Sequence, residues 1–110
     1  MIATQLPTVT PTRDLSALTD QLCEALLTPK SREEMGRLLA DLCTPAEMRT
    51  LAERWHVARL LDERDLTYRE IHDGTGVSTT TIVRVGRFLR QEPHHGYRLA
   101  LDRLRGGDAG

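Results

Sequence analysis

Three helix-start signals divide this chain, and they constrain its fold more than any other feature. Each is a capping box, a Ser or Thr followed three residues later by Glu, and they occur at Ser31–Glu34, Thr44–Glu47 and Thr67–Glu70. In a capping box each side chain accepts a hydrogen bond from the other residue's backbone N–H, which stabilises the first helical turn. In the second box Pro45 occupies the first helical position, where its missing N–H costs nothing. These signals predict a chain of short helices with defined starts.

Apolar residues recur at spacings of three and four along the same segments, as expected for helices that pack on one face. The predicted helices cover residues 14–28, 31–42, 44–64, 79–90 and 97–104, with a further short one that starts at Thr67 and ends at Gly74 and Gly76. In the longest helix the apolar face contains Met48, Leu51, Trp55, Ala58 and Leu61. No segment alternates apolar and polar residues for long enough to form a strand. The predicted fold class is therefore all-α, with about six short helices.

Length and composition limit the domain count and exclude several classes of protein. With 110 residues the chain is too short for a second independent core, so residues 13–106 are expected to form a single helical domain. Residues 1–12 contain two prolines and four threonines without an apolar period, and are predicted to be a disordered arm. No run of 18 apolar residues could span a membrane, and the N-terminus lacks the basic and apolar parts of a signal peptide.

Residue types that bind metals or perform catalysis do not gather in a known pattern. Cys23 and Cys43 are far apart and form no paired zinc motif, which suits a reducing cytoplasm. His94 and His95 lie in a predicted loop without further ligands, and no glycine-rich phosphate loop or strained nucleophile turn occurs. We therefore expect a cytoplasmic protein that is not an enzyme, with no metal, no cofactor and no membrane association.

Residues 67–90 match the pattern of a helix-turn-helix. That motif needs an apolar residue on the first helix, glycine at the turn, an apolar residue just after it and two apolar anchors on the second helix. The five positions are filled here by Ile71, Gly76, Val77, Ile82 and Val85. One position departs from the pattern, because His72 stands where alanine is usual, and we expect its side chain to point partly outward.

The second helix of this motif carries polar and basic residues on the side away from its apolar anchors. At about 100° per residue, Thr80, Val83, Arg84 and Arg87 share one outer face. Arginine can donate two hydrogen bonds to guanine, threonine can bond bases or phosphates, and valine can contact a thymine methyl group. The predicted DNA-binding residues are Thr67, Arg69, Ser78, Thr79, Thr80, Val83, Arg84 and Arg87. Of these, Arg69 and the hydroxyls of Thr67 and Ser78 are expected to contact the DNA backbone, and the others bases.

Charge and hydrophobicity leave two alternatives open. The net charge of the chain is −1, which is unusual for a strong DNA binder and is compatible with a helical adaptor that binds a protein partner. Three arginines and no acid nevertheless lie within residues 76–90, as expected for a surface that contacts phosphates. The leucine-rich segments 14–28 and 31–42 either form a homodimer interface or fold back on their own chain.

The region from about Leu42 to Leu104 resembles the Trp repressor family. The resemblance is carried by Thr44-Pro45-x-Glu47, Leu51, Arg54, Leu61, Arg69-Glu70, Gly76 and Thr81-Ile82-x-Arg84. The ending GYRLALDRL is most similar to the repressor-related branch of the YerC/YecD type. The resemblance implies an all-helical dimer with intertwined N-terminal helices, whose partner is double-stranded DNA with an operator-like inverted repeat.

The same resemblance implies an effector pocket, which this chain matches only in part. Its matching residues are Thr44, Arg54, Thr81 and Arg84, where the repressor holds tryptophan between two arginines. Val85 stands in place of a glycine and Phe88 in place of a serine, and Asp41 and Cys43 replace leucines of the pocket wall. We therefore hypothesise that tryptophan is not the corepressor. A DNA-binding sensor for another small ligand remains an alternative.

Overall fold

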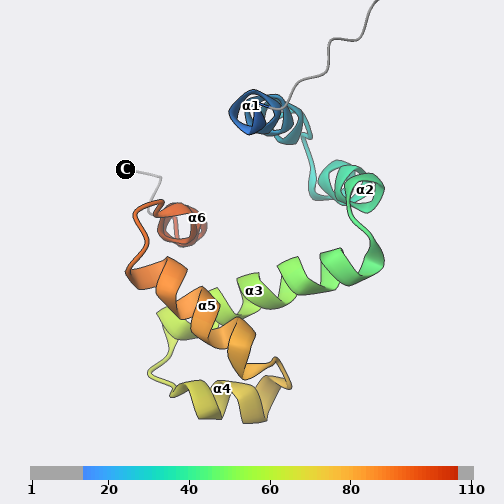
Figure 1. Ribbon diagram of the computed structural model, residues 1–110. Helices are drawn as coiled ribbons and strands as arrows, with labels where there is room; N and C mark the ends of the chain where they lie inside the picture. Colours follow the sequence, from blue (N-terminus) through green and yellow to red (C-terminus); the bar gives the residue numbers. More distant parts are fainter. Residues whose placement is uncertain (1–13, 107–110) are drawn as a thin grey trace, which may run out of the picture. The chain divides into compact units, whose positions relative to one another are not determined.

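The computed structural model describes residues 14–106, which form six α-helices joined by short loops (Figure 1). The helices are α1 (Leu15–Leu26), α2 (Arg32–Leu42), α3 (Pro45–Glu63), α4 (Tyr68–Thr75), α5 (Thr79–Arg90) and α6 (Gly96–Leu104). Within residues 14–106 there is no strand, so the predicted all-α class is confirmed. The arm predicted over residues 1–12 lies outside the described residues.

The chain divides into two compact units, Met1–Leu42 and Cys43–Gly110. The first unit contains α1 and α2, and the second contains α3 to α6. That residues 13–106 act as one domain stays a prediction.

Helices α1 and α2 begin at side-chain caps. The Asp14 carboxylate accepts hydrogen bonds from the backbone N–H groups of Ser16 and Ala17, at 3.0 and 3.3 Å. At the start of α2 the Ser31 hydroxyl accepts from the Glu34 N–H at 3.1 Å, as the capping box predicts. The Glu34 carboxylate, however, accepts from the N–H of Lys30 at 2.8 Å and not from that of Ser31. The predicted box is thus half formed, because the carboxylate reaches one residue further back along the entering chain.

Neither α1 nor α2 has a buried residue. The leucines on the apolar stripe of α1 remain largely exposed, with Leu15 at 73% and Leu18 and Leu22 at 42% of their full accessible area. Isolated helices of 11 or 12 residues are marginally stable in water and depend on packing. Within residues 14–42 the first unit therefore shows no core of its own.

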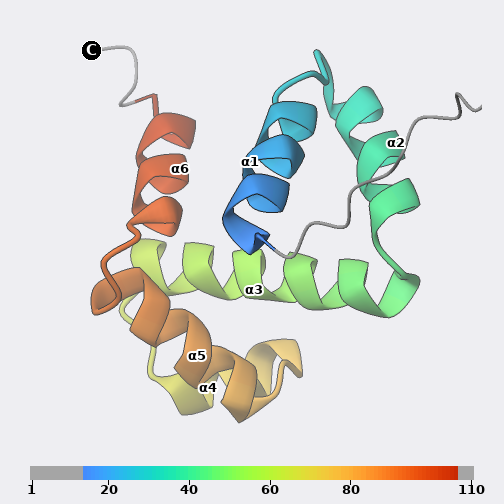
Figure 2. The same cartoon turned by 45° about the horizontal axis from the view of Figure 1, so that its top comes forward.

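The second unit has a compact apolar core. Its buried residues are Val57, Ala58, Leu61, Ile71, Val77, Ile82 and Val85, which come from α3, α4, the turn after α4, and α5. Figure 2 shows α5 crossing the C-terminal half of α3. The predicted apolar face of α3 was therefore only partly right. Val57 is fully buried where α5 crosses, whereas Leu51, further toward the N-terminus, is 45% exposed.

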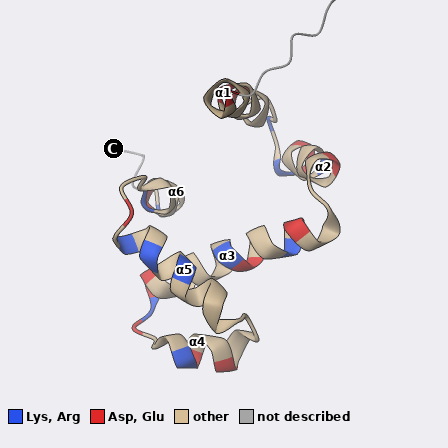
Figure 3. Cartoon of the chain, viewed as in Figure 1, with Lys and Arg blue, Asp and Glu red and all other residues tan. Residues whose placement is uncertain are grey.

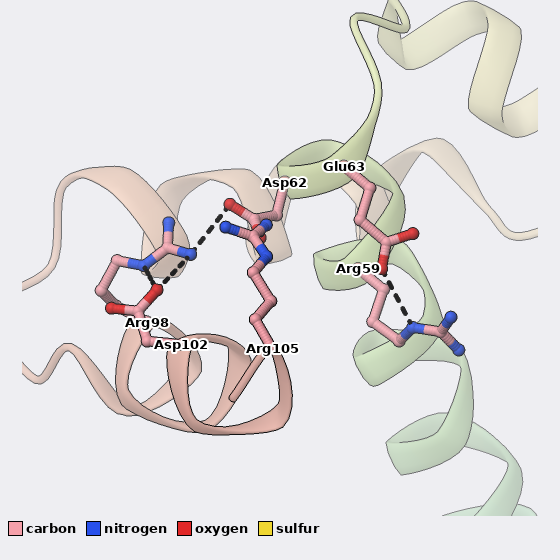
Figure 4. A network of polar contacts seen from close by, with 6 residues as sticks. All are labelled: Arg59, Asp62, Glu63, Arg98, Asp102 and Arg105. Atoms are coloured by element: carbon pink, nitrogen blue, oxygen red, sulfur yellow. Dashed lines mark hydrogen bonds and ion pairs between the residues drawn. The ribbon is translucent and has the colours of Figure 1, made fainter. Parts of the chain in front are cut away.

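Helix α6 packs against α3 through one buried leucine, an aromatic pair and a cluster of ion pairs. Leu101 is 4% exposed, and the ring of Tyr97 lies 6.3 Å from that of Trp55. Figure 4 shows the Asp62 carboxylate of α3 facing two arginines at α6. It accepts a hydrogen bond from Arg98 at 2.9 Å and is also paired with the guanidinium of Arg105. These contacts fix α6 on α3 in the second unit.

Candidate nucleic-acid interface

Helix α4 begins at a complete capping box and ends at a glycine turn. The Thr67 hydroxyl accepts from the Glu70 N–H at 3.0 Å, and the Glu70 carboxylate accepts from the Thr67 N–H at 2.8 Å. Gly76 ends the helix with φ 78° and ψ −1°, and its N–H donates to the His72 carbonyl at 2.9 Å. This left-handed conformation costs other residues energy, which explains the glycine. Gly74, which was also predicted to end the helix, lies inside it.

Side-chain hydrogen bonds hold the turn between α4 and α5. Nδ1 of His72 lies 2.7 Å from the Val77 carbonyl oxygen, and because a carbonyl only accepts, this nitrogen carries the proton. The Thr75 hydroxyl donates to the Ile71 carbonyl at 2.6 Å and accepts from the Val77 N–H at 3.1 Å. His72 is exposed, as expected, and its role in the turn was missed. Its replacement of the usual alanine was the only signal in the sequence.

The inner side of α5 packs against the other helices of the second unit. Ile82 and Val85 are fully buried, as predicted, and Leu89 packs partly against the same core. Gly86 is buried against the Tyr68 side chain of α4, so closely that a Cβ at this position would collide with the Tyr68 hydroxyl. The orientation of α5 about its own axis is therefore fixed by packing on two neighbouring helices.

The outer side of α5 is exposed and basic. Thr79 and Thr80 are exposed, Val83 is 49% exposed, and the Arg87 side chain is 53% exposed. In Figure 3 the acidic colour is absent from α5, while the basic colour recurs along it. Arg84 is less exposed than the others, because its guanidinium carbon lies 4.3 Å from the centroid of the Phe88 ring. Seven of the eight predicted DNA-binding residues are thus exposed, and Arg84 is half-buried.

The predicted backbone-contact residues lie around the starts of α4 and α5. The Ser78 hydroxyl accepts from the Thr81 N–H at 3.2 Å and donates to the Thr81 hydroxyl at 3.0 Å, so it caps α5. The Thr67 hydroxyl has the corresponding capping role in α4. The Arg69 side chain is 90% exposed and lies 4.0 Å from the Asp73 carboxylate. Thr67 and Ser78 are thus exposed residues at the N-termini of α4 and α5.

The described residues contain neither a cluster of metal ligands nor a helix that could span a membrane. Within residues 14–106 no three His, Cys, Asp or Glu side chains come together to hold a metal ion. None of the described helices is long and apolar enough to cross a bilayer. His94 and His95 are both exposed, and the His94 ring stacks on Phe88.

Comparison with known proteins settles the family. The sequence matches the Trp repressor protein family over residues 17–105. The chain belongs to the Trp repressor family. This is a family of DNA-binding regulators and not of enzymes.

Relatives of this Trp repressor family member agree in sequence and in fold. The chain is 45% identical over 86 residues to the uncharacterized protein YerC of Bacillus subtilis (strain 168), covering 78% of this chain and 81% of that protein. The crystal structure of a candidate Trp repressor from Staphylococcus aureus is similar to the structure of this chain, with a TM-score of 0.74. The two chains are 35% identical, and the match covers 86% of this chain and 96% of the other. A TrpR-like protein from Eubacterium eligens gives a TM-score of 0.72 and 38% identity over 80% and 89% of the two chains.

The effector residues implied by the Trp repressor resemblance lie on two helices, Thr44 and Arg54 at α3 and Thr81 and Arg84 on α5, and their common use stays a prediction. Thr44 caps the start of α3, and Arg54 lies ten residues later on the same helix, about 15 Å away along its axis. Arg54 is half-buried, and its Nε atom is buried without a hydrogen-bond partner. Thr81 binds the Ser78 hydroxyl. Arg84 alone of the four lines a hollow of about 260 Å³, with Phe88, His94, Gly96 and Tyr97.

Proposed function

We propose that this chain is a sequence-specific transcription regulator that binds DNA as a homodimer through α4 and α5 and does so without tryptophan. The observation that carries the proposal is the division of α5 into two sides. Ile82 and Val85 are fully buried on one side, while Thr80, Val83 and Arg87 are exposed on the other. A helix anchored in this way can enter the major groove, since its outer side is not needed for packing.

Each residue of the proposed interface has a role that suits its chemistry. Arg84 and Arg87, with Thr79, Thr80 and Val83, contact base edges in the major groove. Arg69 and the caps Thr67 and Ser78 contact phosphates, where the helix N-termini add a favourable field for anions. Phosphate contacts of this kind make the affinity fall steeply with salt concentration.

The dimer is proposed because α1 and α2 together bury none of their residues, although α1 carries a stripe of leucines. Leu15, Leu18 and Leu22 repeat along α1 and are 73%, 42% and 42% exposed, and α2 has no buried residue. A second copy of the chain would cover such a surface, in line with the intertwined helices that the resemblance implies. Two α5 helices would then enter successive major grooves about 34–36 Å apart and contact an inverted repeat.

Tryptophan independence is supported by the surroundings of Arg84. The Phe88 ring already lies 4.3 Å from the Arg84 guanidinium, on which a bound aromatic ligand would have to stack. The Val85 side chain is fully buried in the core where the repressor keeps a glycine. We expect no heat of binding when L-tryptophan is titrated into the protein in a calorimeter. Micromolar binding that also tightened DNA binding would contradict this part of the proposal.

Selection of bound sequences from random DNA is the experiment that tests the whole proposal. We expect an inverted repeat to be enriched, and gel-shift titrations at two salt concentrations to show much weaker binding at the higher one. Sedimentation of the free protein should give the mass of two chains. A helical adaptor for a protein partner would enrich no sequence and show no salt-sensitive DNA retention. Since chromosomal DNA in bacteria lies in the cytoplasm, the proposal includes a cytoplasmic location.

A second candidate function, a sensor for another small ligand, is favoured by the hollow beside Arg84. It has a volume of about 260 Å³ and is lined by three aromatic side chains and one guanidinium, namely Phe88, His94, Tyr97 and Arg84. A planar anion would suit such a lining, since guanidinium and aromatic groups both stack on planar rings. The sensor would show a change in DNA affinity on adding the ligand, whereas the first proposal predicts full affinity without it.

A further inference from the structure

The C-terminal half of α5 holds two arginines against one aromatic ring. The guanidinium carbons of Arg84 and Arg87 lie 4.3 and 5.2 Å from the centroid of the Phe88 ring. A cation near a ring face is attracted by the electron density of the ring, so Phe88 limits the directions of both side chains. The ring itself is half-buried and stacks on His94, with a centroid distance of 5.9 Å and an angle of 11°. Phe88 is therefore a fixed support for the two guanidinium groups.

Glu92 adds a second constraint, on Arg87 alone. Its Oε2 atom lies 3.7 Å from Nε of Arg87. The backbone N–H of Glu92 donates to the Arg87 carbonyl at 3.1 Å, and that of Gln91 donates to the same oxygen at 2.8 Å. These bonds close the end of α5 and hold the Glu92 backbone at a set position beside Arg87. At 3.7 Å the contact is an ion pair and not a hydrogen bond, and the carboxylate lies beside Nε, so the two terminal nitrogens can donate to another acceptor.

We propose that Glu92, supported by Phe88, is a positioning residue that presents the terminal edge of Arg87 to a DNA base and thereby increases sequence selectivity. This inference rests on the proposed function. The terminal edge of arginine has two parallel donors, which match the O6 and N7 acceptors of guanine. An arginine without such a constraint binds phosphates of any sequence equally well, because phosphate contacts carry no sequence information.

The charge of Glu92 acts in the same direction as its geometry. The Glu92 carboxylate lies beside the Arg87 guanidinium, so a phosphate that accepts a hydrogen bond from Arg87 is brought close to this carboxylate and repelled by it. Base edges carry no net charge and are repelled far less. Glu92 therefore weakens non-specific binding more than specific binding, and selectivity arises partly from a repulsive element.

The test replaces the Glu92 carboxylate by the uncharged amide of glutamine, which has nearly the same shape. For Glu92→Gln we expect the ratio of specific to non-specific DNA affinity to fall about two- to fivefold, the range of an exposed ion pair. Phe88→Leu should lower the ratio in the same direction, because the ring that limits both arginines is lost. Glu63→Gln is the matched control. It removes one negative charge from a carboxylate of similar exposure, which pairs with Arg59 at 3.6 Å on α3, and should leave the ratio unchanged.

A double variant separates a positioning role from a general effect of charge. If Glu92 acts through Arg87, then Glu92→Gln will not change the ratio further in a chain that already carries Arg87→Ala. Circular dichroism should show the same helix content in all variants. The inference is overturned if Glu92→Gln keeps the wild-type ratio, if Glu63→Gln lowers it equally, or if the effect persists without Arg87. Wild-type protein that enriches no DNA sequence would overturn the proposed function as well.

Discussion

Replacing Asp62 by asparagine should lower the free energy of unfolding of the second unit by about 1–2 kcal/mol. The side chain is only 9% exposed, accepts a hydrogen bond from Arg98 at 2.9 Å and is paired with Arg105. A hydrogen bond between charged groups contributes about 1.5–3 kcal/mol. The variant does not lose all of this free energy, because Arg98 and Arg105 are 38% and 50% exposed and water can hydrate them once the carboxylate is gone. The asparagine oxygen can also still accept one hydrogen bond, which lowers the estimate to about 1–2 kcal/mol, around the lower end of that range.

Asp102, a second partner of Arg98, provides the control variant for this prediction. Asp102 accepts from Nε of Arg98 at 3.0 Å, but its side chain is 53% exposed. An exposed pair spaced i,i+4 contributes about 0.3–0.5 kcal/mol, so Asp102→Asn should have only this small effect. Added salt should diminish the contribution of Asp102 more than that of Asp62, because buried pairs are screened less.

Urea unfolding followed by circular dichroism measures both variants. At about 1–1.5 kcal/mol per M of urea, the midpoint for Asp62→Asn should move down by about 1 M, and that for Asp102→Asn by less than 0.5 M. Protein concentration must be equal throughout, since a dimer unfolds at a concentration-dependent midpoint. Equal shifts for the two variants would refute the reasoning that burial decides the strength of the Arg98 pairs.

Three further variants test the turn and the proposed reading surface. Gly76→Ala should lower stability by about 1 kcal/mol or more in thermal unfolding, because alanine is strained at φ 78°, and an unchanged midpoint would contradict this. His72→Ala removes the 2.7 Å bond to the Val77 carbonyl and should cost about 0.5–1.5 kcal/mol, with faster amide exchange at residues 75–78 as the measured sign of a looser turn. Arg87→Ala should weaken specific DNA binding by about 1–3 kcal/mol if two bonds to guanine are lost. An unchanged ratio of specific to non-specific affinity would remove Arg87 from the base-contacting residues.

Helix starts and ends were predictable from sequence at most positions, because they depend on neighbours within four residues. The boxes at Thr44 and Thr67 form as expected, and α5 covers the predicted residues 79–90. Two local predictions were wrong, namely the hydrogen-bond partner of Glu34 and the end of α4 at Gly74. In both cases a nearby residue took the predicted role. Lys30 offered its N–H to the Glu34 carboxylate, and Gly76 ended α4 two residues after Gly74.

Contacts between helices could not be predicted in the same way. The sequence placed Leu51 and Ala58 on one apolar face of α3, but burial depends on where α5 crosses, so Val57 is buried and Leu51 is not. The role of His72 in the turn was missed as well, since its ring reaches a carbonyl five residues ahead.

The sequence alone determined the class of this protein, namely a chain of capped helices with a glycine turn and a basic, exposed side on the helix that follows. Those features follow from hydrogen bonds and side-chain spacing within single helices. Only the tertiary structure decided which side chains meet across helices, such as Asp62 with Arg98, 36 residues apart. The structure also decided a contact within one segment, because only the directions of the side chains bring Phe88 and Glu92, one and five residues further along the chain, beside Arg87. The physical reason is that these contacts depend on the crossing of helices and on side-chain directions, which no local pattern specifies.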